Sequence, residues 1–131
     1  MKIRSKLFVR MLVLVSSLLL VVSSYAETKG EPITVVSHVD IIPDAYMAGA
    51  EDNAARLFRA ESAASHKDKG LVSYVVLQEV GLLNHFTIVE TWHDAKVYAL
   101  HVGSPHTVQF RRRIQPLLGS PFDARMLRQC R

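Results

Sequence analysis

The sequence predicts an α+β fold of the ferredoxin-like type, in which two helices cover one face of a four-stranded antiparallel sheet. Hydrophobic patterns with the period of a strand or of a helix follow one another in the order β-α-β-β-α-β, which is typical of that layer. Apolar residues also occupy both faces of the expected strands, as at Val35 beside Val36 and at Ile88 beside Val89. Such strands indicate a sheet that is covered on both sides.

The first two elements lie before Gly70. A strand is expected over Ile33–Ile42, where β-branched residues alternate with others and Pro43 ends the run. Asp44 can cap a helix that is expected to reach about His66. The apolar residues of this helix recur at steps of three and four: Met47, Ala50, Ala54, Leu57, Phe58 and Ala64. Gly70 suits the reversal after the helix ends.

The remaining elements complete the layer. Two strands are expected over Leu71–Val80 and Leu83–Trp92, joined as a hairpin around Gly81. A helix with a break follows from Asp94 to about Leu118, and the last strand is expected over residues 122–129.

The first 26 residues have the pattern of a signal peptide, which leaves residues 27–131 as one small mature domain. Four basic residues precede an apolar run from Met11 to Val22, and Ser24-Tyr25-Ala26 forms a small-x-small cleavage site. The run is short for a membrane span, which needs roughly 20 residues. We therefore expect an exported protein, periplasmic or secreted, that has no membrane segment after cleavage. An uncleaved N-terminal anchor is the alternative.

The charge balance gives no reason to expect nucleic acid as a partner. The chain has 16 basic and 12 acidic residues, but four of the basic ones fall in the expected signal peptide. Twelve of each sign remain in the mature domain, so the high pI comes from the leader. The run Arg111-Arg112-Arg113 is either a solvated helix face or an anion site. Cys130 is the only cysteine and is expected to be a free thiol.

The segment Phe86–Phe110 carries most of the functional signal. Glu90 and Trp92 share one face of the expected strand with the apolar residues before them. Asp94 then caps a helix, and Ser104-Pro105 restarts it after a break. This path brings Trp92, His101 and His106 to one end of the sheet. Polar aromatic side chains beside apolar ones suit a pocket for a flat organic molecule.

These residues resemble the antibiotic biosynthesis monooxygenase family. Its members often show E-x-W followed by H-x-x-S-x-H-x-x-x-F, and here the residues are Glu90, Trp92, His101, Ser104, His106 and Phe110. The family's G-C-x-x-Y appears as Gly70 to Tyr74 with Leu71 in place of Cys. Lys67-Asp68-Lys69 stands where Glu-Pro commonly precedes that Gly. The resemblance spans about Ile33 to Gln129.

The resemblance implies a homodimer in which two sheets form an α+β barrel. It also implies a monooxygenase that acts on a quinol or polyphenol without a bound cofactor, because an electron-rich substrate anion can itself pass an electron to oxygen. The sequence agrees in having no nucleotide-binding or haem-attachment motif.

His101 and His106 are the candidate catalytic bases, since a neutral imidazole can take a proton from a phenol and return it. Either could instead make only a structural hydrogen bond. No metal site is expected, because the two lie five residues apart across a break instead of at three- or four-residue spacing. The candidate substrate-binding residues each have core packing or pairing across the sheet as the alternative: Trp92, Tyr74, His38 and Phe110. Glu90 is expected to have a partner, such as an Arg.

Three functional classes remain open from the sequence. The first is the monooxygenase with a His base and a pocket for a small aromatic molecule. The second is a binding or sensing protein of the same fold that has no turnover. The third is a haem-degrading relative, for which the resemblance implies an Asn in the first strand and a His late in the second helix. Trp92 fits that third class, but Ser37-His38 and the arginine run occupy those two places.

Overall fold

The predicted order of strands and helices is present in the computed structural model, which describes residues 30–130. The expected signal peptide lies outside the described residues. The helices are α1 (Ala50–Ser65), α2 (Ala95–Val102), α3 (Pro105–Ile114) and the 3-10 helix η1 (Gln115–Leu117). The strands are β1 (Ile33–Asp40), β2 (Leu71–Glu79), β3 (Leu82–Trp92) and β4 (Asp123–Leu127).

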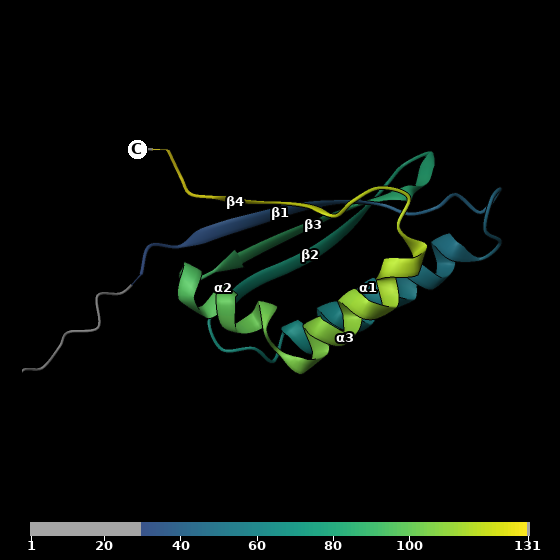
Figure 1. Ribbon diagram of the computed structural model, residues 1–131. Helices are drawn as coiled ribbons and strands as arrows, with labels where there is room; N and C mark the ends of the chain where they lie inside the picture. The colour runs from purple at the N-terminus through teal and green to yellow at the C-terminus, as the bar shows by residue number, and fades with distance from the viewer. Residues whose placement is uncertain (1–29, 131) are drawn as a thin grey trace, which may run out of the picture.

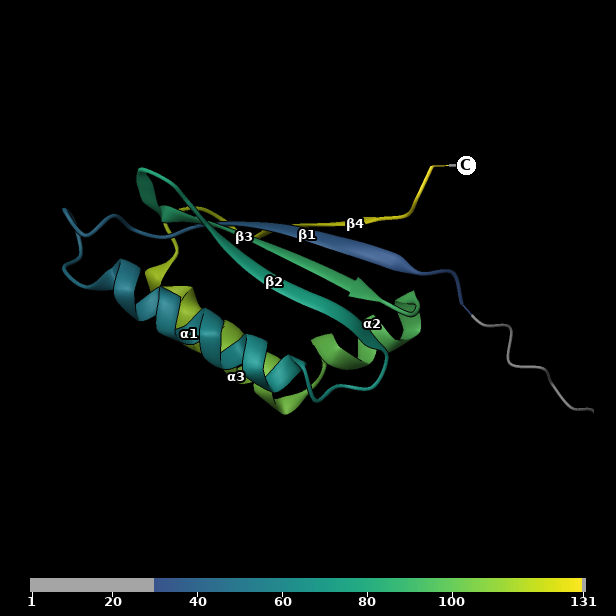
Figure 2. The ribbon, with the colours of Figure 1, turned by 180° about the vertical axis from the view of Figure 1, so that it is seen from behind.

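The strands form one antiparallel sheet in the order β2-β3-β1-β4. All the helices lie on one face of this sheet, with α1 and α3 side by side beneath it (Figures 1 and 2). This is the ferredoxin-like α+β layer that the sequence predicts. Among the described residues, no helix is both long and apolar enough to cross a membrane.

The core fills the space between the sheet and the helices. Side chains alternate along β1 and β3, so that every second residue faces the helices and is buried. Phe58 of α1 packs against Phe86 of β3 and Phe110 of α3, with ring centroids 4.6 and 5.5 Å apart. This aromatic contact joins the two long helices to the middle of the sheet.

Helix α1 begins at Ala50, five residues later than the start that a cap at Asp44 predicts. Gly49 has a positive φ of 77° and precedes the first helical turn, while residues 44–49 form turns. Asp44 nevertheless serves the helix start: its Oδ1 accepts a hydrogen bond from the backbone N–H of Glu51, and its own N–H donates to Oε1 of Glu51. This reciprocal pair spans seven residues, farther than the local capping pattern that the sequence displays.

Candidate functional site

The end of β3 supplies the floor of the site. Trp92 is fully buried, and its Nε1–H donates a hydrogen bond of 3.0 Å to Oε2 of Glu90. The two side chains share a strand face because they are two residues apart. The His101 ring lies against the Trp92 ring with centroids 4.7 Å apart. The expected partner of Glu90 was an Arg, and the structure shows that its direct partner is Trp92.

Helix α2 places His101 over this floor. The side chain of Asp94 accepts a hydrogen bond from the N–H of Val97, which caps the helix as predicted. Gly70 has a φ of 85° and lies against Val97, where an added Cβ would come within 2.8–3.0 Å of that side chain. A glycine at this position therefore lets the start of β2 approach the first turn of α2.

The helix break brings His106 back toward His101. Gly103 ends α2, and the hydroxyl of Ser104 accepts a hydrogen bond from the N–H of Thr107 at the start of α3. The two imidazole rings consequently lie 5.5 Å apart between centroids. A continuous helix would turn residues five apart to different sides, so the break is what makes the pair.

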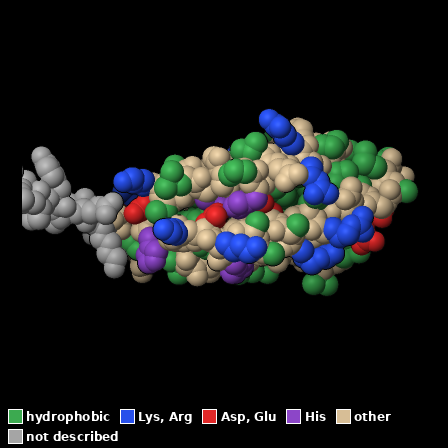
Figure 3. Space-filling view, turned by 90° about the horizontal axis from the view of Figure 1, so that it is seen from below, with side chains coloured by type: hydrophobic (Ala, Val, Ile, Leu, Met, Phe, Trp, Pro, Cys, Tyr) green, Lys and Arg blue, Asp and Glu red, His purple; other side chains and the backbone are tan. Residues whose placement is uncertain are grey.

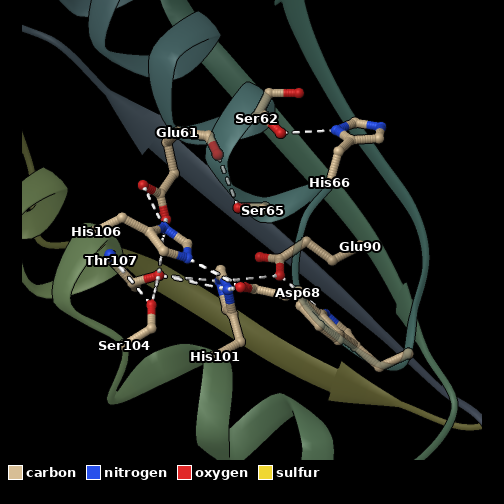
Figure 4. Close-up of polar contacts among 11 residues, drawn as sticks. Glu61, Ser62, Ser65, His66, Asp68, Glu90, His101, Ser104, His106 and Thr107 are labelled. Atoms are coloured by element: carbon tan, nitrogen blue, oxygen red, sulfur yellow. Dashed lines mark hydrogen bonds and ion pairs between the residues drawn. The ribbon is translucent and has the colours of Figure 1, made fainter.

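Two carboxyl groups hold the two histidines (Figure 4). Oδ2 of Asp68 lies 2.8 Å from Nδ1 of His101 and 3.1 Å from Nε2 of His106. On its other side, Nδ1 of His106 lies 3.1 Å from both carboxyl oxygens of Glu61. Thr107 donates its hydroxyl to Oε1 of Glu61 at 2.7 Å. The result is a chain of polar groups, Glu61–His106–Asp68–His101, which we call the two-histidine network.

The network favours a charged His106. Partial burial lowers the pKa of His106, but its hydrogen bonds to Glu61 and Asp68 and the charges of those two groups together raise it by more, so the net shift is upward. His106 therefore bridges two carboxyl groups, which favour its imidazolium form. Asp68 contacts only Nδ1 of His101, and Nε2 of His101 lies 3.4 Å from the Thr107 hydroxyl and 3.7 Å from Glu90.

Beside His101 lies a cavity of about 20 Å³, room for about one water molecule. Its apolar wall is formed by Ile88, Tyr74, Tyr98, Phe110 and Phe122, and its polar lining includes Ser37, Glu61, Glu90, His101, Thr107 and Arg111. Burial raises the pKa of Glu90, more than the Trp92 hydrogen bond lowers it. Burial also raises the pKa of Tyr74 and Tyr98, and the nearby Glu90 adds to both shifts. These groups favour their protonated forms.

The structure brings most of the sequence-predicted site residues together. His101, Tyr74 and Phe110 line the cavity, whereas Trp92 lies behind His101 and His106 lies one ring farther away. His38 does not lie at the cavity, and the structure bears out its alternative role of pairing across the sheet. This residue is exposed on the opposite face of the sheet, where its Nδ1 lies 3.3 Å from the Thr87 hydroxyl, because its neighbours Ser37 and Val39 take the inward positions.

Glu61 and Asp68 are site residues that the sequence reasoning missed. Asp68 lies two residues before Gly70, where the resembled family commonly has the Glu of Glu-Pro. An acidic residue at this motif position could have identified Asp68 as a site residue. Glu61 had no such mark, although it interrupts the apolar face of α1 and is only 4% exposed. A buried acid on an apolar helix face calls for a partner, and His106 is that partner.

Glu61, His101 and His106 could also hold a metal ion. Each offers one ligand atom, and the three atoms lie within 4.8 Å of one another. The argument from five-residue spacing therefore fails, since the helix break makes the two rings converge. The ligand atoms of this cluster already form hydrogen bonds without a metal. Among residues 30–130, no buried side-chain nitrogen or oxygen lacks a hydrogen-bond partner.

The network reaches the surface on the helix side. In Figure 3, which views this side, a His side chain and acidic side chains lie together near the middle of the face, with Lys and Arg side chains around them. His106 has a side chain that is 26% exposed, in contrast to 4% for His101. Solvent therefore meets His106 first, and His101 faces the interior.

The protein is thus a small α+β domain of the ferredoxin-like class. Its candidate site lies between the sheet and the helices, where Asp68 holds the buried His101 beside a cavity with aromatic walls. The sequence model of the family "Antibiotic biosynthesis monooxygenase" matches residues 46–113. The chain belongs to this family, which confirms the resemblance seen in its motifs.

Solved structures show the same fold. Rv0793 from Mycobacterium tuberculosis has a TM-score of 0.69 at 21% identity, covering 77% of this chain and 97% of that one. PA3566 from Pseudomonas aeruginosa has a TM-score of 0.68 at 22% identity, covering 79% and 98%. SnoaB from Streptomyces nogalater, a cofactor-independent oxygenase solved as the N63A mutant, has a TM-score of 0.66 at 14% identity, covering 78% and 96%.

Proposed function

We propose that this protein is a cofactor-independent monooxygenase that oxidises a hydroquinone or related polyphenol, with His101 as the general base. The observation that carries the proposal is the setting of His101. Its Nδ1 is held by Asp68 at 2.8 Å, and the side chain lines a cavity with aromatic walls. A proton on Nδ1 that is shared with Asp68 leaves the Nε2 lone pair to accept a proton.

The reaction balances without an added reductant. His101 removes a phenolic proton, and the phenolate passes one electron to O₂. The two radicals join at a ring carbon that carries hydrogen, which forms a C–O bond. Breaking the O–O bond, with loss of the ring hydrogen as a proton, yields a carbonyl and water. For a hydroquinone, one O₂ thus gives one hydroxyquinone and one water, and the substrate supplies all four electrons.

The size of the cavity sets a requirement on this mechanism. Room for about one water does not admit an aromatic ring, so the substrate must displace side chains at the rim. Tyr98 and Phe122 are partly exposed and Arg111 is exposed, and all three line the cavity. Outward rotation of these side chains would widen the cavity beside His101.

Oxygen uptake tests the proposed function. Purified protein with hydroquinone should consume one O₂ per substrate without releasing H₂O₂, so that catalase returns no oxygen. Spontaneous two-electron oxidation releases one H₂O₂ per quinone and serves as the reference. Saturable binding of hydroquinones without any catalysed uptake would instead identify a binding protein of the same fold.

Two further proposals concern the state of the protein. We propose export with cleavage after Ala26, which the leader pattern of residues 1–26 supports. N-terminal sequencing that finds Met1 on the exported protein would refute this proposal.

We also propose a homodimer through the sheet face opposite the helices. Its support is a row of Val75, Val89 and Val36, which are register partners across three strands on that face.

A further inference from the structure

Arg111 is a cation at the cavity whose side chain forms no direct ion pair with another described residue. Among residues 30–130 its guanidinium forms no ion pair or hydrogen bond, although the residue lines the same cavity as His101. The positive charge of Arg111 acts on two groups at the cavity. Burial raises the pKa of Glu90 and of Tyr98, and the guanidinium of Arg111 opposes both shifts. The side chain is exposed, so it reaches from the cavity to solvent.

The local charge balance leaves Arg111 available to an anion. Burial raises the pKa of Glu90 and so disfavours its charged form, and no direct ion pair joins Glu90 to Arg111. Glu61 is engaged by the Thr107 hydroxyl and by His106. An arginine donates hydrogen bonds in a planar fork that matches a carboxylate, which makes it a specific reader of that group.

We propose that Arg111 selects a substrate that carries a carboxylate, so that the ligand class is a dihydroxybenzoic acid or a similar acidic polyphenol. The aromatic ring lies against Tyr98 and Phe122, the hydroxyl to be deprotonated faces His101, and the carboxylate lies at Arg111 on the rim. This inference rests on the proposed function for the role of the hydroxyl, but the binding preference can be measured without turnover.

The next residue in the chain offers a matched control. Arg112 has the same side chain on the same helix and is equally exposed, but it does not line the cavity. Substituting either arginine removes one positive charge from α3. A general effect of net charge would therefore appear in both variants, and recognition at the cavity only in the Arg111 variant.

Anaerobic binding of 2,5-dihydroxybenzoate and its methyl ester to the full domain tests the inference. Trp92, the only tryptophan, packs on His101 and reports binding by its fluorescence, and calorimetry serves as an independent readout. Wild type and Arg112→Gln should bind the acid about tenfold to a hundredfold more tightly than the ester, the range for a charge-assisted hydrogen bond. Arg111→Gln should lose this preference, and Arg111→Lys should keep part of it.

Three results would overturn the inference: equal binding of acid and ester by wild type, an unchanged preference in Arg111→Gln, or binding of neither probe by calorimetry. Failure of the proposed function looks different. If the acid binds through Arg111 but aerobic incubation consumes no oxygen, the selectivity stands and the oxygenase assignment falls.

Discussion

His106 is bound between two carboxyl groups, and this links its proton to the stability of the fold. Its hydrogen bonds to Glu61 and Asp68, together with the charges of those groups, raise its folded pKa above the ordinary value of 6.5 despite partial burial. A raised folded pKa gives stability that is fully present below pH 6.5 and is lost as the pH rises through the folded value.

The variant His106→Gln should therefore be less stable than wild type at pH 5.5–6, by about 1.5–3 kcal/mol, the range for hydrogen bonds to charged groups. The difference should shrink as the pH rises above the folded pKa of His106. Urea unfolding of both proteins from pH 5.5 to 9 measures it. A difference that stays constant or grows with pH would contradict the charged bridge.

At the residue scale, the sequence identified His101, Tyr74 and Phe110 because they lie in family motifs or on a clear apolar period. It could not identify Glu61 as a site residue, because its partner His106 is 45 positions away and only packing of α1 against α3 brings them together. For His38 the sequence left the pocket and pairing across the sheet both open, and the structure shows the pairing, with Thr87. Alternation predicts two faces of a strand, but the sequence alone did not fix which parity faced the helices.

At the scale of elements, alanine substitutions at two glycines with positive φ can distinguish the cost of backbone strain from the cost of a close contact. Gly70 has a φ of 85° and Gly81 has a φ of 88°, but only Gly70 has a neighbour within 4 Å of an added Cβ, namely Val97. Alanine at Gly81 should cost about 1–2 kcal/mol for the left-handed backbone. Alanine at Gly70 should cost a further 1–3 kcal/mol, roughly, because of overpacking between β2 and α2.

Thermal or urea unfolding of Gly70→Ala and Gly81→Ala provides the comparison, and Gly81→Ala is the control for strain alone. Equal losses in the two variants would mean that the contact with Val97 yields easily, and the close approach of β2 to α2 would not explain the glycine.

The elements themselves were largely predictable from the sequence. Strong periodicity located all four strands and both long helical regions, and Asp94 and Ser104 act as the N-caps that the sequence suggests. The start of α1 was wrong because the turns of residues 44–49 depend on Gly49 and on the seven-residue pairing of Asp44 with Glu51. The last strand, Asp123–Leu127, is shorter at both ends than expected.

At the scale of the whole molecule, substitutions on the outer face of the sheet test the proposed homodimer. Leu77 points to that face from β2 and is 52% exposed, while Leu100 lies on α2 and is 70% exposed. A lysine at Leu77 would place a charge in a dimer interface between two sheets, whereas a lysine at Leu100 would not.

We expect Leu77→Lys to shift the protein from dimer toward monomer in sedimentation equilibrium at micromolar concentration, and Leu100→Lys to remain dimeric. A wild-type protein that is monomeric and stably folded under these conditions would contradict the homodimer. A dimer that survives Leu77→Lys and is lost in Leu100→Lys would place the interface on the helix side instead.

The central claim is that His101 is the base of a cofactor-free oxygenation, and turnover of a hydroquinone under ¹⁸O₂ tests it most directly. Wild type should place one ¹⁸O atom in the product and the other in water. His101→Gln, which keeps a polar side chain near Asp68 but cannot take the proton, should lower kcat by about 100-fold or more. His66→Gln, at an exposed histidine outside the network, should leave kcat unchanged. Product without ¹⁸O, or undiminished kcat in His101→Gln, would contradict the account.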